Sequence, residues 1–396
     1  MQPERRDVAG LPAPDPVSRR HSERVHEHIR AAIVAAGGSI SFAEFMQHAL
    51  YAPGLGYYVA GARKFGAEGD FVTAPEVSPV FGRVVARAAA PILRQIETAE
   101  ILELGAGSGA LAVAMLGRLA ELGALPTRYL ILEVSADLEE RQRQAIGALD
   151  PELAGRVEWL TGLPREFAGV VLANEVADAL PVERFLKDHG EVRQLRVTLA
   201  GEDFAWQPCT APPELGERVA AIERYVGYVL PDGYRSELSP GLGAWLGDIG
   251  ASISRGVVFL LDYGVSRREY YARERDHGWL RCCFRHHAHD DPLILPGIQD
   301  LSAWVDFTTV AEAASACGLV VGAYLPQSQF LMHNGLEDEL ASFNSLARTE
   351  QLELSRQVKV LTLPGEMGEH FKCMVLHRGS VELSPGLSAA DRAHTL

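Results

Sequence analysis

Apolar residues in the middle of the chain form short, nearly continuous runs. Four runs, at 101–104, 129–132, 157–160 and 170–173, precede a fifth at 257–261. Strands that are buried on both faces of a parallel sheet have this composition, and stretches of helical spacing separate the runs. The pattern therefore predicts an α/β fold in which helices cover both faces of a parallel sheet.

Periodicity and capping signals predict helices outside these runs. Ser41 with Glu44 and Thr309 with Glu312 have the spacing of a capping box, and Gly318 is expected to end the second of these helices. Apolar residues that recur every three to four positions predict further helices. These are expected at 22–36, 111–122, 135–149 and 214–232.

The remaining segments are expected to form a hairpin, a last strand, a long loop and two tails. Residues 192–206 alternate around Gly201, which predicts a hairpin, and 371–377 have the composition of a strand. Residues 51–79 are rich in glycine and aromatic residues, which is typical of a functional loop. We expect the chain to divide into a core at 99–189 and 236–377 and an inserted hairpin and helix at 190–235. A helical and glycine-rich segment at 21–98 is expected to cover the ligand-binding site of the core, with a flexible tail at 1–20 and another tail at 378–396.

The first candidate site is Glu103–Gly109, where the first predicted strand turns into a helix. Glycines there let the backbone approach a ligand closely, and the helix N-terminus offers N–H groups. A dinucleotide site is formally matched through Gly105, Gly107 and Ala110, while a methyl-donor site is matched by the acidic residue ahead of G-x-G-x-G. A tight turn without any ligand is the third interpretation.

Two carboxylates change the balance between these cofactors. Glu133 ends the second strand, where it can accept hydrogen bonds from both hydroxyls of a ribose, and this suits either cofactor. Glu103 discriminates between them. A carboxylate beneath the loop repels a pyrophosphate but helps to hold a ligand that carries an α-amino group and a sulfonium.

Polar residues directly follow the fourth predicted strand. Asn174, Glu175 and Asp178 are expected to face the crevice at the carboxyl ends of the strands. Because Glu175 and Asp178 are three residues apart, we expect them at the start of a helix with both carboxylates in one cavity. Such a pair can orient a guanidinium, with Glu175 as its principal partner. The alternative is a solvated turn in which Asp178 caps a helix.

Charge and composition narrow the classes of partner. The 396 residues contain 37 Lys and Arg against 52 Asp and Glu, a net charge of −15, which disfavours broad nucleic-acid binding and suits a cationic ligand or basic peptide segment. No apolar run approaches the roughly 18–20 residues of a membrane span, and no secretory signal is recognisable. The five cysteines are scattered, so we expect a reduced, cytoplasmic protein.

The segment 285–291 contains three histidines and two aspartates. His286, His287 and His289 could supply metal ligands, but neither a helical His pair nor a sulfur ligand at a suitable spacing accompanies them. We therefore expect a polar loop and no metal. Asp262 and Tyr263, which follow the fifth strand, are expected to be structural groups in the crevice.

Taken together, these motifs resemble the MidA-type S-adenosylmethionine-dependent methyltransferases, a family that includes a mitochondrial complex I assembly factor. The resemblance extends from about Ser41 to about Lys372. The motifs that carry it are 69–76, 103–109, 174–181, 261–264, 296–300 and 305–307. It implies a Rossmann-like class I methyltransferase sheet with an N-terminal extension and an inserted α+β subdomain. For the mitochondrial relative it implies dimethylation of an arginine on a complex I subunit.

The resemblance also implies roles for residues at matching positions. Asn174, Glu175 and Asp178 face the substrate, and Asp70 and Thr73 fold over the site. The cofactor is held by Glu103, Gly105, Ala106, Gly107, Gly109 and Glu133. Two departures from the family pattern, at 176–177 and 278–283, lie where substrate contacts are expected.

Three functions follow from these features. The leading hypothesis is an S-adenosylmethionine-dependent methyltransferase that modifies an arginine of a protein, such as a subunit of a respiratory complex. The second is an assembly factor or chaperone that acts by binding a partner on the same fold; the intact loop at Glu103–Gly109 together with Glu133 argues against it. The third, an NAD-dependent oxidoreductase, is disfavoured by Glu103.

Overall fold

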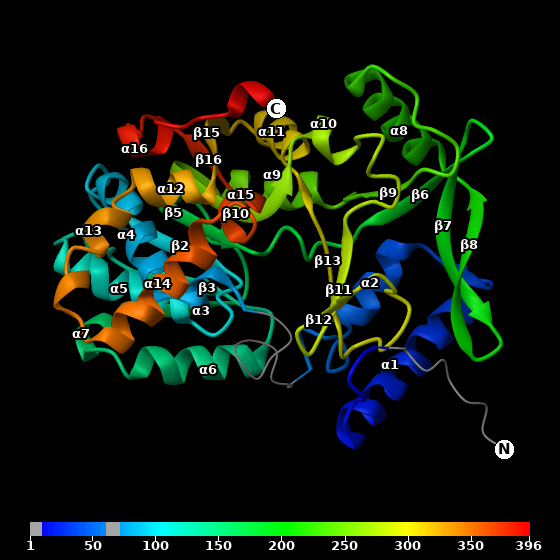
Figure 1. Cartoon of the computed structure of the whole chain (residues 1–396), viewed down its shortest axis with the longest axis horizontal. Helices are drawn as coiled ribbons and strands as arrows, with labels where there is room; N and C mark the ends of the chain where they lie inside the picture. The colour runs from blue at the N-terminus through cyan, green and yellow to red at the C-terminus, as the bar shows by residue number, and fades with distance from the viewer. Residues whose placement is uncertain (1–9, 61–71) are drawn as a thin grey trace. The chain divides into compact units, whose positions relative to one another are not determined.

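The computed structural model describes residues 10–60 and 72–396, and it contains two compact units (Figure 1). The first unit consists of Met1–Phe71, Ala179–Gly241 and Arg267–Ala303. The second consists of Val72–Asp178, Leu242–Ser266 and Trp304–Leu396. The chain therefore passes between the units several times.

The second unit contains an eight-stranded sheet within the described residues. Its order is β15 (Val320–Pro326), β16 (Phe371–Arg378), β10 (Ile253–Val265), β5 (Phe167–Asn174), β2 (Glu100–Leu104), β3 (Tyr129–Leu132) and β4 (Val157–Leu160), and β14 (Val305–Asp306) pairs with β10. The pairs from β10 to β4 are parallel, which confirms the five predicted strands. Strand β16 confirms the strand predicted at 371–377, and it runs antiparallel to both β10 and β15.

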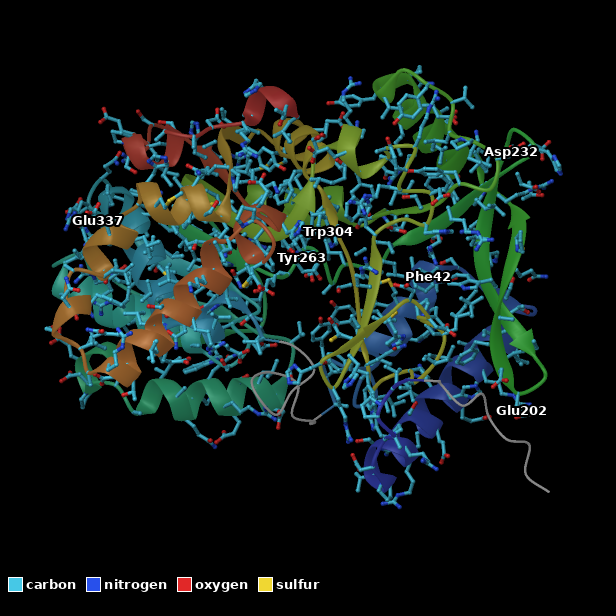
Figure 2. The ribbon with its side chains drawn as sticks, in the orientation of Figure 1. Phe42, Glu202, Asp232, Tyr263, Trp304 and Glu337 are labelled. Atoms are coloured by element: carbon cyan, nitrogen blue, oxygen red, sulfur yellow. The ribbon has the colours of Figure 1, made fainter. Side chains whose placement is uncertain are left out.

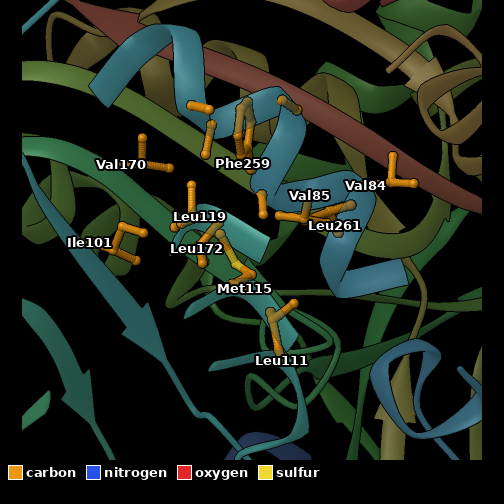
Figure 3. Packing of buried hydrophobic residues seen from close by; sticks show 14 of the residues in the cluster. Val84, Val85, Ile101, Leu111, Met115, Leu119, Val170, Leu172, Phe259 and Leu261 are labelled. Carbon is orange, nitrogen blue, oxygen red and sulfur yellow. The ribbon is translucent and has the colours of Figure 1, made fainter. Parts of the chain in front are cut away.

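Two helices, α4 (Pro79–Leu93) and α5 (Ala110–Glu121), pack against one face of this sheet. Figure 3 shows their apolar side chains among those of the strands. The labelled residues are Val84, Val85, Leu111, Met115 and Leu119 from the helices, and Ile101, Val170, Leu172, Phe259 and Leu261 from the strands. On the opposite face Val171, Val258 and Leu260 are fully buried, so both faces are covered. Helix α5 confirms the prediction at 111–122, whereas α4 was not predicted.

Two glycines allow three strands of the sheet to approach closely. A Cβ atom on Gly169 of β5 would lie 1.8 Å from the carbonyl oxygen of Glu100 in β2, and one on Gly256 of β10 would lie 2.0 Å from that of Gly169. Both glycines have positive φ, 149° and 151°. Any larger residue at either position would force the strands apart.

Helix caps in the second unit correct one expectation and confirm two others. Helix α11 (Phe307–Ala316) begins after Asp306, whose side chain accepts hydrogen bonds from two backbone N–H groups, so the capping box predicted at Thr309 and Glu312 is wrong. Gly318 follows this helix with φ of 78°, as expected for a helix stop. Helix α6 (Ala136–Gly147) is capped by Ser135 and confirms the helix predicted at 135–149.

The C-terminal segment is folded onto the second unit. Leu387, in the short helix α16 (Pro385–Ser388), is fully buried. The backbone N–H of Arg392 donates to the carbonyl of Tyr324 in β15 at 2.6 Å. The expectation that residues 378–396 form a loose tail is therefore wrong, because the segment is packed against the second unit. The other helices of this unit are α3 (Ala74–Val77), α7 (Pro151–Ala154), α9 (Leu242–Ser252), α12 (Gln327–His333), α13 (Leu336–Glu339), α14 (Arg348–Thr362) and α15 (Met367–His370).

The first unit contains two small antiparallel sheets. One has the order β1 (Ser39–Ile40), β7 (Glu191–Ala200), β6 (Glu183–Asp188) and β9 (Arg235–Leu238), with β8 (Asp203–Thr210) paired to β7. The hairpin β7–β8 confirms the prediction around Gly201. The other has the order β12 (His287–His289), β11 (Leu280–Phe284) and β13 (Asp300–Ala303).

Four helices accompany these sheets: α1 (Pro16–Ala35), α2 (Phe42–Tyr51), α8 (Pro213–Val226) and α10 (Arg267–Tyr270). The capping box of Ser41 and Glu44 is present, and the ring centroids of Phe42 and Trp206 lie 5.0 Å apart. Helix α1 begins at Pro16, because Asp15 caps it, so the expectation of a flexible tail is wrong for residues 16–20, and residues 1–9 lie outside the described part of the chain. Helix α8 ends at Val226, because Gly227 is left-handed, and not at 232.

The compact units cut across the segments predicted from the sequence. Strands β6 and β9 pair with each other and β6 also pairs with β7, so residues just outside 190–235 belong to the same unit as the inserted hairpin. The functional division into 21–98, 99–189, 190–235 and 236–377 stays a prediction. No helix within residues 10–60 and 72–396 is long and apolar enough to cross a membrane.

Candidate active site

The glycine-rich loop connects β2 to α5 in the second unit. Gly105, Gly107 and Gly109 all have positive φ, at 62°, 56° and 85°, and Gly109 is the residue that caps α5. Other residues rarely adopt this conformation, which explains the three glycines. A Cβ on Gly107 would meet no atom within 4 Å, so the backbone there borders open space. Ala106 is buried in the core, so only its backbone can serve a ligand.

Glu103 lies beneath this loop, buried at the end of β2. One carboxylate oxygen accepts a hydrogen bond of 2.6 Å from the hydroxyl of Tyr129 in β3. Burial raises the pKa of Glu103 to about 7, against the lowering effect of this hydrogen bond, and the charge of Glu133 raises it further. The sequence indicated the position of Glu103 correctly but not its partner.

Glu133 follows β3 at the same edge of the sheet. Its Oε1 accepts from the backbone N–H of Ser135 at 3.0 Å, and its Oε2 accepts from the side-chain amide of Gln142 at 2.9 Å. The next residue, Val134, is 66% exposed. An ionisable group and an apolar surface therefore lie side by side just after β3, a pairing that suits a ribose attached to a flat base.

The predicted polar group follows β5. Glu175 has φ of 53°, and its backbone N–H donates to the carbonyl of Leu261 in β10 at 2.9 Å. Its Oε1 accepts from the backbone N–H of Ala74 at 3.1 Å and from the side-chain amide of Asn174 at 3.2 Å. Removal of the carboxyl group from water, together with the negative charge of Asp178, raises the pKa of Glu175 to about 8.

Residues 175–182 form bends and turns, so the expectation that Glu175 and Asp178 begin a helix is wrong. The physical reason is Asp262, which is fully buried at the end of β10. Its Oδ2 accepts from the backbone N–H groups of Ala177 and Asp178, at 3.0 and 3.2 Å, and its Oδ1 accepts from that of Tyr263 at 2.9 Å. A buried side chain thus holds the backbone of this loop, and the left-handed φ of Glu175 is incompatible with the start of a right-handed helix.

Tyr263 completes this arrangement, because its hydroxyl donates to the carboxylate of Asp178. Its ring lies beside that of Trp304, with 6.1 Å between their centroids (Figure 2). Burial, with the charges of Asp178 and Glu175 nearby, raises the pKa of Asp262 well above its ordinary value. Asp262 and Tyr263 therefore hold the loop that carries Glu175 and Asp178, as expected of structural groups.

The resulting group is rich in hydrogen-bond acceptors. The carboxyl groups of Glu175 and Asp178 lie within one electrostatic environment, because the charge of Asp178 acts on Glu175. The Oδ1 atom of Asn174 is buried and has no hydrogen-bond partner among the described residues. A buried acceptor is costly when it is left unpaired, and this atom is available to a hydrogen-bond donor of a ligand.

The other predicted site residues are less informative. Asp70 lies outside the described residues, whereas Thr73 precedes α3 and its backbone N–H donates to the side chain of Glu76. His286, His287 and His289 lie in the first unit, in β12 and the turn before it, and the described residues contain no cluster of three or more groups suited to a metal. Sequence reasoning missed Gln142 and Ala74, because nothing in their local spacing marks them.

Comparison with known proteins gives three concordant results. A family model of S-adenosyl-L-methionine-dependent methyltransferases matches residues 84–325. A crystal structure from Burkholderia thailandensis, described as a candidate methyl transferase and bound to S-adenosyl-homocysteine, is 38% identical and superposes with a TM-score of 0.91 over 98% of this chain and 100% of that one. The protein arginine methyltransferase NDUFAF7 homolog of Drosophila melanogaster is 29% identical, and the match covers 89% of this chain and 84% of the relative. The protein arginine methyltransferase NDUFAF7 of Rattus norvegicus is 28% identical, and the match covers 91% of this chain and 86% of the relative.

Proposed function

Because the chain belongs to the family of S-adenosyl-L-methionine-dependent methyltransferases, we propose that it transfers a methyl group to an arginine side chain of a protein. The observation that carries the proposal is the cluster of hydrogen-bond acceptors after β5, formed by Asn174, Glu175 and Asp178. The names of the curated relatives, protein arginine methyltransferases, agree with it.

The residues at the edge of the sheet fit the cofactor. The loop of Gly105, Gly107 and Gly109 offers backbone N–H groups, Glu133 accepts hydrogen bonds from the ribose, and Val134 contacts the base. Glu103, when ionised, attracts the cationic amino-acid part of the ligand through the loop. When bound, S-adenosylmethionine supplies an electrophilic methyl group on a sulfonium.

We infer that the methyl acceptor is an arginine, since a guanidinium presents five hydrogen-bond donors in a plane and keeps its positive charge at physiological pH. Glu175 and Asp178 accept hydrogen bonds from two of its nitrogens, and the unpaired Oδ1 of Asn174 accepts from it as well. The positive charge of the guanidinium lowers the raised pKa of Glu175, so that the carboxyl group ionises when the substrate binds.

These carboxylates act by positioning and by electrostatics. They hold the guanidinium with one nitrogen directed toward the methyl group, and they draw positive charge away from that nitrogen. On transfer the nitrogen would gain the methyl group as its bond to the sulfonium breaks, S-adenosyl-homocysteine would be the leaving group, and the nitrogen would release one proton. Glu175, ionised beside the bound guanidinium, is the base that would accept this proton.

The test is the identification of the methylated residue. The protein is incubated with isotopically labelled S-adenosylmethionine and a cell extract, and the labelled proteins are digested and sequenced by mass spectrometry. We expect label on arginine nitrogens within cationic segments. Label on another residue type, or on a small molecule only, would contradict the proposal. Tight binding of S-adenosyl-homocysteine without any transfer would instead favour a partner-binding role.

A further inference from the structure

Gln142 in α6 is fully buried although it is polar, and its side-chain amide joins three separate segments. Its Nε2 donates to the carbonyl of Gly107 at 3.0 Å and to Oε2 of Glu133 at 2.9 Å. Its Oε1 accepts from the indole N–H of Trp159 in β4 at 2.9 Å. One side chain thus links the glycine-rich loop, the carboxylate after β3 and the next strand of the sheet.

The partners allow only one orientation of this amide. An indole nitrogen can only donate, so it must face the oxygen of Gln142, while a carbonyl and a carboxylate can only accept, so they must face the NH₂ group. All the polar capacity of the NH₂ group is used by Gly107 and Glu133. A glutamate of the same length would place a carboxylate against two acceptors.

Neighbouring contacts fix the same group further. The guanidinium of Arg143 lies 4.0 Å from the centre of the Trp159 ring, which holds the indole in place. A Cβ on Gly109 would lie 3.3 Å from Cα of Gln142, so the loop and α6 are packed closely at this point. The side chain of Gln142 is therefore fixed by its packing, so its amide can fix the positions of Gly107 and Glu133.

Glu133 is bound from two sides as a result. Ser135 binds one oxygen through its backbone, and Gln142 binds the other, so the plane of the carboxylate is set relative to the glycine-rich loop. Each carboxylate oxygen can accept a second hydrogen bond. The direction in which it does so depends on the two bonds that hold the group.

We propose that Gln142 is a positioning residue for cofactor binding, which couples the loop at Gly107 to Glu133 so that both bind the nucleoside in a fixed mutual geometry. This inference rests on the proposed contact of Glu133 with the ribose. Gln142 itself does not touch the cofactor. It acts by holding the two groups that do.

The test substitutes Gln142→Glu in the full chain and measures the affinity for S-adenosyl-homocysteine by calorimetry. A hydrogen bond to a charged group is lost and a repulsion is gained, so we expect binding to weaken by about tenfold or more. The KM for S-adenosylmethionine should rise in parallel, while kcat at saturating cofactor changes by less than about twofold. An unchanged affinity in a folded variant would overturn the inference.

The matched control is Gln144→Glu, two residues along the same helix. Gln144 is exposed and its amide donates to Glu140 on the same helix, so the same change of charge should leave the affinity unaltered. If Gln142→Glu does not fold, Gln142→Met removes the donors without adding charge and carries the same expectation. Equal losses at Gln142 and Gln144 would show a general charge effect and reject the positioning role.

A double-mutant cycle shows whether Gln142 acts through Glu133. In a Glu133→Gln background the residue at 133 can donate to the new carboxylate of Gln142→Glu, so the second substitution should cost much less than in the wild type. Strictly additive losses would contradict the coupling. Failure of the proposed arginine acceptor looks different, because it removes methylated arginine and leaves these binding affinities as they are.

Discussion

The buried carboxylate of Asp262 accepts a hydrogen bond from the backbone N–H of Asp178, 84 residues earlier in the chain, at 3.2 Å. The same carboxylate binds the N–H groups of Ala177 and Tyr263. It therefore shapes the loop after β5 from a strand that is neighbouring in space but remote in sequence.

Replacement of Asp262 by Asn should weaken both the fold and the reaction. Asn has one acceptor atom where the three N–H donors require two, so at least one buried N–H loses its partner, at a cost of about 1–3 kcal/mol. We expect a lower free energy of unfolding and a lower kcat, with a smaller effect on the KM for the cofactor. Denaturant titration and steady-state kinetics measure these, with Asp276→Asn on the exposed surface as the control.

Substitution Glu175→Gln should preserve cofactor binding and abolish transfer. The amide keeps an acceptor for the backbone N–H of Ala74 but cannot carry the charge that faces a guanidinium or accept its proton. We expect the affinity for S-adenosyl-homocysteine to stay within about threefold and kcat to fall by about 100-fold or more. A Gln variant with near-normal kcat would show that another group has this role.

The raised pKa of Glu175 predicts how stability depends on pH. Between its ordinary value of 4.5 and about 8, the folded protein holds a proton that the unfolded chain has released, so the free energy of unfolding falls as the pH rises through this window. Glu175→Gln removes this contribution. Relative to the wild type, the variant should gain on the order of 3–4 kcal/mol between pH 5 and pH 8. Urea titrations at four pH values measure this, and a constant difference across them would contradict the assigned pKa.

Gly169→Ala should destabilise the sheet strongly. The added Cβ would lie 1.8 Å from the carbonyl oxygen of Glu100, on backbone that cannot give way without breaking the β2–β5 pairing. We expect a loss of more than about 3 kcal/mol, or no folded protein. Gly117→Ala, in α5, is the control, because a Cβ there meets no atom within 4 Å and alanine favours a helix.

The sequence predicts those parts of the fold that local patterns determine. Nearly continuous apolar runs identified β2, β3, β4, β5 and β10, and the cap at Ser41 followed from its spacing to Glu44. Helix α4 escaped prediction, because it directly follows a segment rich in glycine and proline. The start of α11 was wrong, because Asp306 competes with Thr309 for the role of cap.

The candidate site was predicted in part for a related reason. The glycines and the carboxylates each follow a strand, so their place at the edge of the sheet can be read from the chain. The groups that orient them cannot. Gln142 lies 35 residues from Gly107, and Asp262 lies 85 residues from Ala177, and only the folded sheet brings these pairs together.

The left-handed backbone of Glu175 has a consequence for the evolution and engineering of the protein. A side chain other than glycine is strained at φ of 53°, by an amount on the order of 1 kcal/mol or more. Glycine at this position would relieve that strain and remove a carboxyl group from a poorly hydrated setting, yet it would delete the group proposed to bind the acceptor. Screens that select only for heat resistance should therefore enrich inactive variants at Glu175, a trade-off between robustness and activity confined to one residue.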